Sequence, residues 1–153
     1  MSVWRPKDRI QVKALGLVWR NGELLAAQIA NDDGSPKGVR PLGGGVEFGE
    51  RWQDTIVREF QEELNVAVQV TGRPLILENI YSHQGVLGHE VFFVAEIDFL
   101  DTAYAGGGPI TFYEDNGTAC RADWYDRAAL DTGGLALYPT GLKAHLMARS
   151  TPV

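Results

Sequence analysis

The chain has 153 residues, 44% hydrophobic and 22% charged, as in an ordinary globular protein, and we expect one domain over residues 1–153. Its net charge of −6 argues against broad nucleic-acid binding, which needs many phosphate-neutralising Lys and Arg side chains. Short apolar runs, an N-terminal MSVWRPKDRI without the apolar core of a signal peptide, and Cys120 as the single cysteine predict a reduced, cytoplasmic protein with no membrane contact.

Apolar and β-branched segments separated by polar turns predict strands along most of the chain. The clearest case is a hairpin in which two strands are joined by a tight turn at Asn21-Gly22. A polar loop at 31–36 and the glycine-rich turn at 43–45 bound a shorter run. The expected strands are residues 10–20, 23–30, 39–42, 66–70, 75–81, 89–99 and 119–125.

The segment 52–64 predicts a helix. Trp52, Ile56, Phe60 and Leu64 recur at four-residue spacing, so they form one apolar stripe that faces the core. The glutamates of the segment fall on the other side of the helix. The helix therefore has a buried face that stabilises it and a solvated face that is available for chemistry.

Residues 102–117 predict a long loop around Gly106-Gly107-Gly108-Pro109, and loops of this length are often lids or specificity elements. Tyr104, Phe112 and Tyr113 could stack on a planar ligand, seal the edge of the core or contact a second copy of the chain. A short helix is expected near 127–130. A closing amphipathic helix is expected from Leu142, His145, Leu146 and Arg149.

The helix and the turn before it also carry glycine and charged residues at fixed spacing: Gly44, Glu50, Arg58, Glu59, Glu62 and Glu63. Residues three and four apart share a helix face, so Glu59, Glu62 and Glu63 project as one cluster of carboxylates. Like charges this close repel one another, and a bound hard cation relieves the repulsion. At average residue usage, a match at all six positions arises by chance about once in 10⁷ starting points.

This spacing is the Nudix box, and the chain resembles the Nudix hydrolase family over residues 44–66. One position departs from the family pattern, because Asn65 stands where the family usually has glycine. Asparagine is the next-best residue for the left-handed conformation expected at that helix end. The resemblance implies the Nudix fold, an α/β/α sandwich of the α+β class in which a mixed sheet is flanked by helices.

The carboxylate chemistry and the resemblance together imply a site for Mg²⁺ or Mn²⁺. Glu59 and Glu63 would chelate one ion, with Glu62 beside them for a second. Nudix enzymes also use a backbone carbonyl of the glycine turn, which here is that of Gly43. Mg²⁺ keeps several waters and prefers carboxylates together with substrate phosphate oxygens, so a partial protein shell is expected.

Other residues would support the reaction. Arg58 lies four residues before Glu62, and we expect it to hold a carboxylate in place rather than to clamp phosphate. Glu50 is fixed in the family pattern and is expected to support the metal or the attacking water. The proton of that water would pass to one of the box glutamates, or to Glu90 or Glu114 outside the box.

Substrate contacts are expected from Gly44-Gly45, which permits close backbone approach, from Arg40, which could reach a terminal phosphate, and from Tyr81. Tyr81 falls near the position at which some dinucleoside-polyphosphate Nudix hydrolases carry a tyrosine, although an aromatic strand residue is more often core. His83 and His89 flank a glycine-containing turn, and exposed turn positions are expected for both.

The expected activity is metal-dependent hydrolysis of a pyrophosphate bond in a nucleoside diphosphate linked to another moiety. Nucleoside triphosphates, dinucleoside polyphosphates and nucleotide sugars remain open as the small phosphorylated nucleotide substrate. One alternative is a Nudix domain that senses such nucleotides without hydrolysing them, and the intact set of glutamates argues against it. Another is pyrophosphate removal from RNA 5′ ends, which would need a basic channel that the net charge does not indicate. A homodimer is common in the family.

Overall fold

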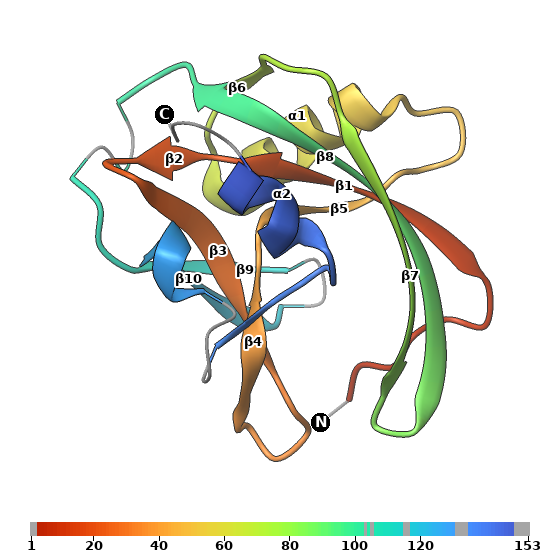
Figure 1. Ribbon diagram of the computed structural model, residues 1–153. Helices are drawn as coiled ribbons and strands as arrows, with labels where there is room; N and C mark the ends of the chain where they lie inside the picture. Colours follow the sequence, from red (N-terminus) through yellow and green to blue (C-terminus); the bar gives the residue numbers. More distant parts are fainter. Residues whose placement is uncertain (1–2, 103, 105, 115–116, 131–134, 149–153) are drawn as a thin grey trace.

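The computed structural model describes residues 3–102, 104, 106–114, 117–130 and 135–148 (Figure 1). The elements are, in chain order, β1 (Ile10–Leu17), β2 (Trp19–Arg20), β3 (Glu23–Ala30), β4 (Pro36–Arg40), β5 (Leu42–Gly45), α1 (Trp52–Leu64), β6 (Val68–Val70), β7 (Leu75–His83), β8 (Val86–Phe99), β9 (Ile110–Tyr113), β10 (Ala119–Asp126), the 3₁₀ helix η1 (Arg127–Ala129), β11 (Ala136–Leu137) and α2 (Leu142–Ala148). Within the described residues, no helix combines the length and the apolar character needed to cross a membrane.

The first sheet has the strand order β5-β1-β8-β6, and β7 also pairs with β8. β1 and β8 run parallel, with Ile10 opposite His89 and Leu17 opposite Glu96. The other pairings in this sheet are antiparallel. The sheet is therefore mixed, as the sequence predicted.

The second sheet has the order β11-β4-β3-β10-β9, with β2 paired to β3. The turn between β2 and β3 has positive φ at both Asn21 (52°) and Gly22 (80°), which is the hairpin geometry that favours an Asn-Gly pair. The chain passes from the first sheet to the second at Val18, so the single strand expected over residues 10–20 is divided there.

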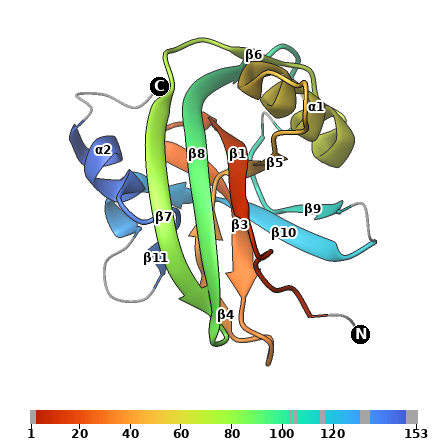
Figure 2. The same cartoon turned by 90° about the vertical axis from the view of Figure 1, so that its right-hand side faces the viewer.

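The two α-helices lie on opposite sides of the strands (Figures 1 and 2). Ile56 and Phe60 of α1 belong to one cluster of buried apolar side chains, and Leu142 and Leu146 of α2 belong to a second. This layering confirms the predicted α+β class and the α/β/α sandwich. It leaves one face of α1 free for polar side chains.

Helix α1 spans the segment that the four-residue apolar spacing predicted. Ile56, Phe60 and Leu64 are buried, and the half-buried Trp52 stacks on Phe93 with 5.6 Å between the ring centroids. The predicted apolar stripe therefore holds the helix to the core, and the glutamates project from its other side.

The helix ends at Asn65, which adopts the left-handed conformation with φ 54° and ψ 43°. Its backbone N–H donates to the carbonyl of Gln61 at 3.0 Å, and that of Val66 donates to the carbonyl of Phe60 at 3.4 Å. These bonds satisfy carbonyls that a helix end leaves free. The departure from the glycine of the family pattern is thus accommodated, because Asn65 adopts the left-handed conformation that glycine would supply.

Two expected loops contain strands. The glycines 43–45 belong to β5 rather than to a turn, because their backbone pairs with β1. Residues 102–117 are not one loop, since β9 lies within them and its side chains Ile110 and Phe112 are buried.

The expectation of an exposed His83 is also wrong. His83 is the last residue of β7 and is buried, with its Nδ1 at 2.7 Å from the Nζ of Lys37 and its ring edge-on to Trp4. Arg149, which was assigned to the closing helix, lies outside the described residues.

Candidate active site

The carboxylate cluster lies where α1 packs against β5. The Glu59 carboxylate fills the space in front of Gly44, where a Cβ atom would collide with it. Gly43 has φ 154°, and a Cβ there would collide with the backbone of Ala14 in β1. Glycine is thus needed at Gly43, and at Gly44 the lack of a side chain leaves room for the Glu59 carboxylate, so the β5 backbone lies close to the acidic face of the helix.

Glu63 lies one helical turn beyond Glu59, and their carboxyl groups are in hydrogen-bond contact. Burial, and then the hydrogen bond and charge of Glu59, raise the pKa of Glu63 to about 8. Two carboxyl groups this close cannot both stay ionised without a nearby positive charge, so the pair holds a proton or binds a cation. Glu62 is exposed beside them.

Arg58 connects this pair to the surrounding backbone. Its Nε and Nη2 donate to the two oxygens of Glu50 at 2.8 and 3.0 Å. Its Nη1 donates to Glu59 at 3.0 Å and to Glu62 at 3.4 Å, and Nη2 also donates to the Gly45 carbonyl at 3.1 Å. One guanidinium therefore orients two helix carboxylates, which supports the expected positioning role of Arg58.

Both carboxylate oxygens of Glu50 accept hydrogen bonds from other groups of the protein. Besides Arg58, it accepts hydrogen bonds from the Thr55 hydroxyl at 2.6 Å and from the Glu47 backbone N–H at 3.2 Å. The hydrogen bonds from Arg58, aided by those from Thr55 and Glu47, lower the pKa of Glu50 to about 2. In this arrangement Glu50 anchors Arg58, whereas its predicted role toward metal or water stays a prediction.

Arg40 lies on the opposite wall, at the end of β4. Its positive charge lowers the pKa of Glu63 and also acts on Lys13, Tyr81 and Cys120. Its Nε is buried and has no hydrogen-bond partner among the described residues. A half-buried guanidinium with an unused donor is suited to bind an anion.

A second polar group lies beside Arg40. Lys13 of β1 forms an ion pair with Glu90 of β8, and both side chains are largely buried. Tyr81 lies beside Glu90, and its ring lies against Gly88, where a Cβ would collide with it. Burial and then the charge of Glu90 raise the pKa of Tyr81, whereas burial and then the charge of Arg40 lower the pKa of Lys13.

No motif predicts Lys13 or Trp4 in this region. The Trp4 ring covers Lys13, with 5.7 Å between the Lys13 Nζ and the ring centroid. Lys13 alternates along β1 with the core residue Leu15, so its side chain is on the inward-facing side of the strand. A charged residue at such a position is the one feature of the sequence that could have indicated it. Nothing near Trp4 in the sequence indicates where its ring lies.

The two candidate bases outside the box differ in their surroundings. Glu90 is buried and paired with Lys13. Glu114 is exposed just after β9, accepts a hydrogen bond from the Cys120 thiol at 3.3 Å, and acts electrostatically on Glu63. Burial, and then Glu114, raise the pKa of Cys120 to about 12, so this side chain is a neutral thiol at physiological pH.

The aromatic residues of the 102–117 segment have three different environments. Phe112 belongs to the core. The Tyr104 hydroxyl donates to the Leu64 carbonyl at 3.2 Å, which fastens the segment to the end of α1. Tyr113 is exposed and is the one of the three that remains free to meet a planar ligand.

The donor set fits a hard divalent cation. Glu59 and Glu63 supply carboxylate oxygens in mutual contact, and β5 supplies backbone carbonyls next to them. Among the described residues, no three His, Cys, Asp or Glu side chains are grouped so that they could hold a metal ion together, so the protein would supply only part of the shell. A partial shell of this kind suits Mg²⁺, which keeps waters and takes phosphate oxygens from a substrate.

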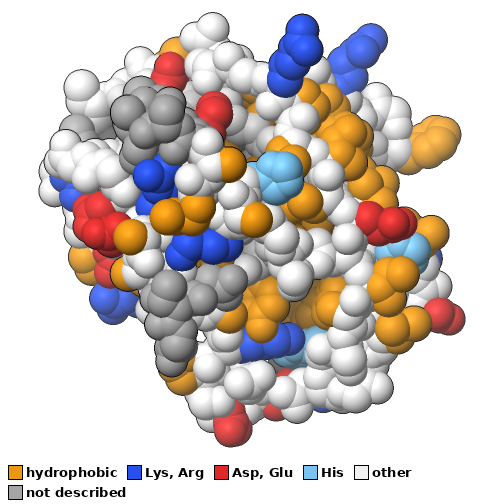
Figure 3. All heavy atoms as spheres, viewed as in Figure 1, with side chains coloured by type: hydrophobic (Ala, Val, Ile, Leu, Met, Phe, Trp, Pro, Cys, Tyr) orange, Lys and Arg blue, Asp and Glu red, His pale blue; other side chains and the backbone are white. Residues whose placement is uncertain are grey.

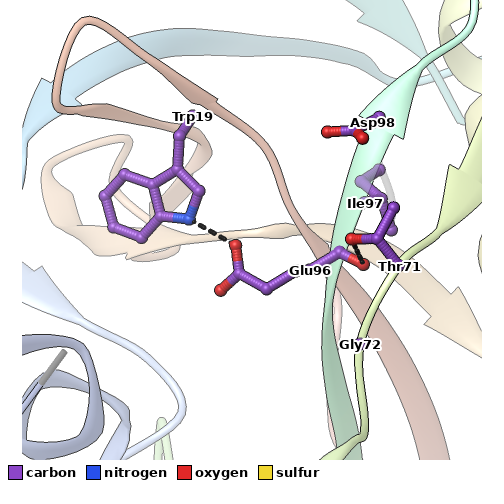
Figure 4. A pocket seen from close by; sticks show the side chains of 6 residues that line it. All are labelled: Trp19, Thr71, Gly72, Glu96, Ile97 and Asp98. Atoms are coloured by element: carbon purple, nitrogen blue, oxygen red, sulfur yellow. Dashed lines mark hydrogen bonds between the residues drawn. The ribbon is translucent and has the colours of Figure 1, made fainter. Parts of the chain in front are cut away.

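A separate cavity of about 170 Å³ lies near the other end of β8, and its lining residues are Trp19, Thr71, Gly72, Glu96, Ile97 and Asp98 (Figure 4). The Trp19 indole N–H donates to the Glu96 carboxylate at 2.8 Å, and the Thr71 hydroxyl donates to the Glu96 backbone carbonyl at 3.2 Å. No box residue lines this cavity, so it is not part of the candidate active site.

Fold and site together define a class of α/β/α domains that carry a carboxylate cluster on one helix, packed against a glycine-rich strand. The sequence matches the NUDIX domain family over residues 9–138, and the chain therefore belongs to that family. The resemblance to this family that was drawn from the box is therefore confirmed. No curated protein matches the sequence.

Several solved structures share the fold. The ORF135 protein of E. coli is 19% identical with a TM-score of 0.59, and the match covers 92% of this chain and 90% of that one. A MutT NUDIX hydrolase of Burkholderia pseudomallei is 16% identical, with a TM-score of 0.55 and coverage of 90% and 98%. An ADP-ribose pyrophosphatase of Streptococcus suis is 16% identical, with a TM-score of 0.52 and coverage of 92% and 94%.

Proposed function

We propose that this protein hydrolyses a pyrophosphate bond in a nucleoside diphosphate linked to another moiety, in a reaction that needs Mg²⁺ or Mn²⁺. The observation that carries the proposal is the contact of the Glu59 and Glu63 carboxyl groups beside Gly44, next to the partly unpartnered guanidinium of Arg40. The carboxylates of Glu59 and Glu63 are suited to bind a metal cation, and the guanidinium of Arg40 is suited to bind an anion. Together these groups are complementary to a phosphate group that carries Mg²⁺.

The box residues would divide the work between holding the ion and keeping its ligands in place. Glu59, Glu62 and Glu63 would hold the ion together with the Gly43 carbonyl. When bound, the ion supplies neutralisation of the phosphate oxygens and a lower pKa for the attacking water. Arg58 would keep the carboxylates oriented, because it already donates to Glu59 and Glu62.

Arg40 and the glycine strand would bind the substrate. The free donor of Arg40 would pair with a phosphate oxygen, and Gly44-Gly45 would let the phosphate chain approach the backbone. Tyr81 lies within the electrostatic reach of Arg40 and would border the same space. A small phosphorylated nucleotide is the substrate that this combination fits.

For the base that takes the proton from water, the surroundings favour Glu114 over Glu90. Glu114 is exposed and close enough to act on Glu63, whereas Glu90 is buried and already paired with Lys13. We therefore expect Glu114→Gln to lower turnover by about 10²–10⁴-fold with little change in KM. Normal turnover in Glu114→Gln would return the role to the box glutamates.

The names of two similar structures guide the choice of substrates to test. One is an ADP-ribose pyrophosphatase and another a MutT NUDIX hydrolase, so a nucleotide with a phosphoanhydride bond is the class to begin with. Nucleoside triphosphates, dinucleoside polyphosphates and nucleotide sugars are the subclasses to compare. A cytoplasmic setting, with Cys120 kept as a thiol, is part of the same proposal.

The test is product release from a panel of these nucleotides and an RNA with a 5′-triphosphate, with Mg²⁺, with Mn²⁺ and with a chelator. Chromatography of the products identifies the bond that is broken. Metal-dependent cleavage of a small nucleotide is the expected result. Tight binding without turnover would indicate the sensor instead, and cleavage confined to the RNA would indicate 5′-end processing.

A further inference from the structure

The N-terminal segment, residues 3–9, is held against the strands by specific contacts. Figure 2 shows it on the same side of the strands as α1, whereas α2 lies on the other side. The Arg5 guanidinium donates to the two carboxylate oxygens of Asp32 at 2.9 and 2.6 Å. Arg5 also donates to the backbone carbonyl of Trp4 at 2.8 Å, so this ion pair fixes the backbone from which the Trp4 ring projects.

The Trp4 ring is oriented by its neighbours although it is half exposed. It lies edge-on to His83, with 5.2 Å between the ring centroids, and the Nζ of Lys13 lies 5.7 Å from its centroid. Lys37 holds His83 in turn, with 2.7 Å between Nζ and Nδ1. Even so, 52% of Trp4 is exposed. A large aromatic ring that is held in place and open to solvent is available to a planar ligand.

The neighbours of Trp4 connect it to the carboxylate cluster. An exposed aromatic side chain is ordinary by itself, so its surroundings decide what it can bind. Lys13, which the ring covers, interacts electrostatically with Arg40 and Glu114. Arg40 and Glu114 in turn act on Glu63. The Trp4 ring therefore lies a short chain of charged side chains away from the groups that would hold the metal and the phosphates.

The surroundings of Trp4 also carry excess positive charge. Four cationic side chains of the described residues lie around its ring or beside its neighbours: Arg5, Lys13, Lys37 and Arg40. Arg5 is paired with Asp32 and Lys13 with Glu90, whereas Lys37 and Arg40 form no ion pair within the described part of the chain. In the lower half of Figure 3, cationic and histidine side chains lie together among hydrophobic ones, over the region between β4 and β7. In a chain with a net charge of −6, this local excess favours an anionic ligand.

Given the hydrolysis proposed above, on which this step rests, we propose that Trp4 is a specificity-determining residue that stacks on the nucleobase of the substrate. The phosphate chain would lie against Gly44-Gly45 and Arg40, and the ribose would extend from it past Lys13 so that the base meets the exposed part of the Trp4 ring. Every nucleobase has a flat π face, so this contact would select nucleotides over phosphate esters without a base and would tolerate different bases.

Equilibrium binding of nucleoside 5′-monophosphates and of ribose 5-phosphate, measured by calorimetry in the presence of Mg²⁺, tests the proposal. The monophosphates contain no pyrophosphate bond and are therefore not consumed, and they differ from ribose 5-phosphate only at the base. At least one of AMP, GMP, CMP and UMP is expected to bind more tightly than ribose 5-phosphate. Trp4→Ala should raise its Kd by about 10–100-fold and remove most of this advantage, because one base stacked on an aromatic ring contributes an effect of that size.

Val3→Ala is the matched control. Val3 is the neighbour of Trp4 in the same segment and has the same exposed fraction, 52%, so Val3→Ala should leave the Kd unchanged. Trp4→Phe keeps an aromatic ring and should retain most of the affinity. The proposal would be overturned if no monophosphate binds more tightly than ribose 5-phosphate, if Trp4→Ala binds like the wild type, or if Val3→Ala loses as much affinity as Trp4→Ala.

Thermal unfolding checks the fold of each variant, and little change is expected because Trp4 and Val3 lie outside both clusters of buried apolar side chains. In hydrolysis of the best substrate of the panel, the loss in Trp4→Ala should appear in KM rather than in kcat. The two proposals can fail separately. Base binding through Trp4 without turnover would leave a nucleotide sensor, whereas hydrolysis that does not depend on Trp4 would keep the proposed function and remove the stacking role.

Discussion

Glu63→Gln preserves the size of the side chain but removes the charge that Glu63 and Glu59 would share with a cation. If the carboxylate pair holds the catalytic ion, turnover should fall by about 10²–10⁴-fold while the melting temperature stays close to that of the wild type. Steady-state hydrolysis of the best substrate of the panel, with thermal unfolding of the same samples, measures both quantities.

The matched control for this substitution is Glu23→Gln. It makes the same chemical change on β3, where Glu23 pairs with Arg20 at 3.5 Å on the surface. Activity should be unaffected there. Near-normal turnover in Glu63→Gln would remove the carboxylate pair from the mechanism.

Glu50 should make stability depend on pH in a defined window. Its pKa is about 2 in the folded protein against an ordinary value of 4.5, mainly because Arg58 donates to it. A carboxylate with a lowered pKa stabilises the folded state above its unfolded pKa, and this contribution is lost as the pH falls from about 4.5 to about 2.

The stability difference between wild type and Glu50→Gln is therefore expected to be largest near neutral pH and to shrink on acidification. Urea unfolding of the two proteins at several values from about pH 7 to about pH 3 measures it. A difference that stays constant over this range would show that Glu50 gains nothing from Arg58 when it is ionised.

Among the elements, α1 was predictable to its bounds and β5 and β9 were not. The helix carries a four-residue apolar period and a residue suited to its left-handed end, so its signal is local. The glycines of β5 have no side chains to show a pattern, and they form a strand because β1 pairs with them. β9 has four residues, so its strand pattern is too short to be recognised beside the loop signal of the glycine-rich segment before it.

The buried face of α1 depends on Phe60. Its side chain is 1% exposed and lies edge-on to Phe99 at 6.1 Å between ring centroids, and Gly16 leaves the space that the ring fills. Phe60→Ala should lower the free energy of unfolding by about 3–5 kcal/mol, because it removes apolar contact and leaves a cavity.

Urea unfolding measures that loss, with Val57→Ala as a control on the same helix. Val57 is 40% exposed, so its truncation should cost far less. Equal effects of the two substitutions would mean that the helix does not depend on its apolar stripe.

At the scale of the whole molecule, the sequence predicted the part of the candidate site that lies within the box. It did not predict the wall opposite the helix, which β4 and β1 form. Glu59, Glu62 and Glu63 are brought together by helix spacing alone. Arg40 acts on Glu63, and Lys13 lies near Arg40, because the arrangement of strands in the two sheets brings β4 and β1 to this site, and no local pattern encodes that arrangement.

Substitutions in the Lys13–Glu90 ion pair measure how much this wall contributes to the stability of the fold. Both side chains are largely buried, so Lys13→Met leaves Glu90 without its counter-charge and should cost about 3–5 kcal/mol of stability. Lys13→Met combined with Glu90→Leu removes both charges and should recover most of that loss. Urea unfolding of the wild type, both single variants and the double variant gives the coupling energy. A coupling near zero would mean that Tyr81 and Arg40 already compensate Glu90, and that the four side chains act as one network rather than as a pair.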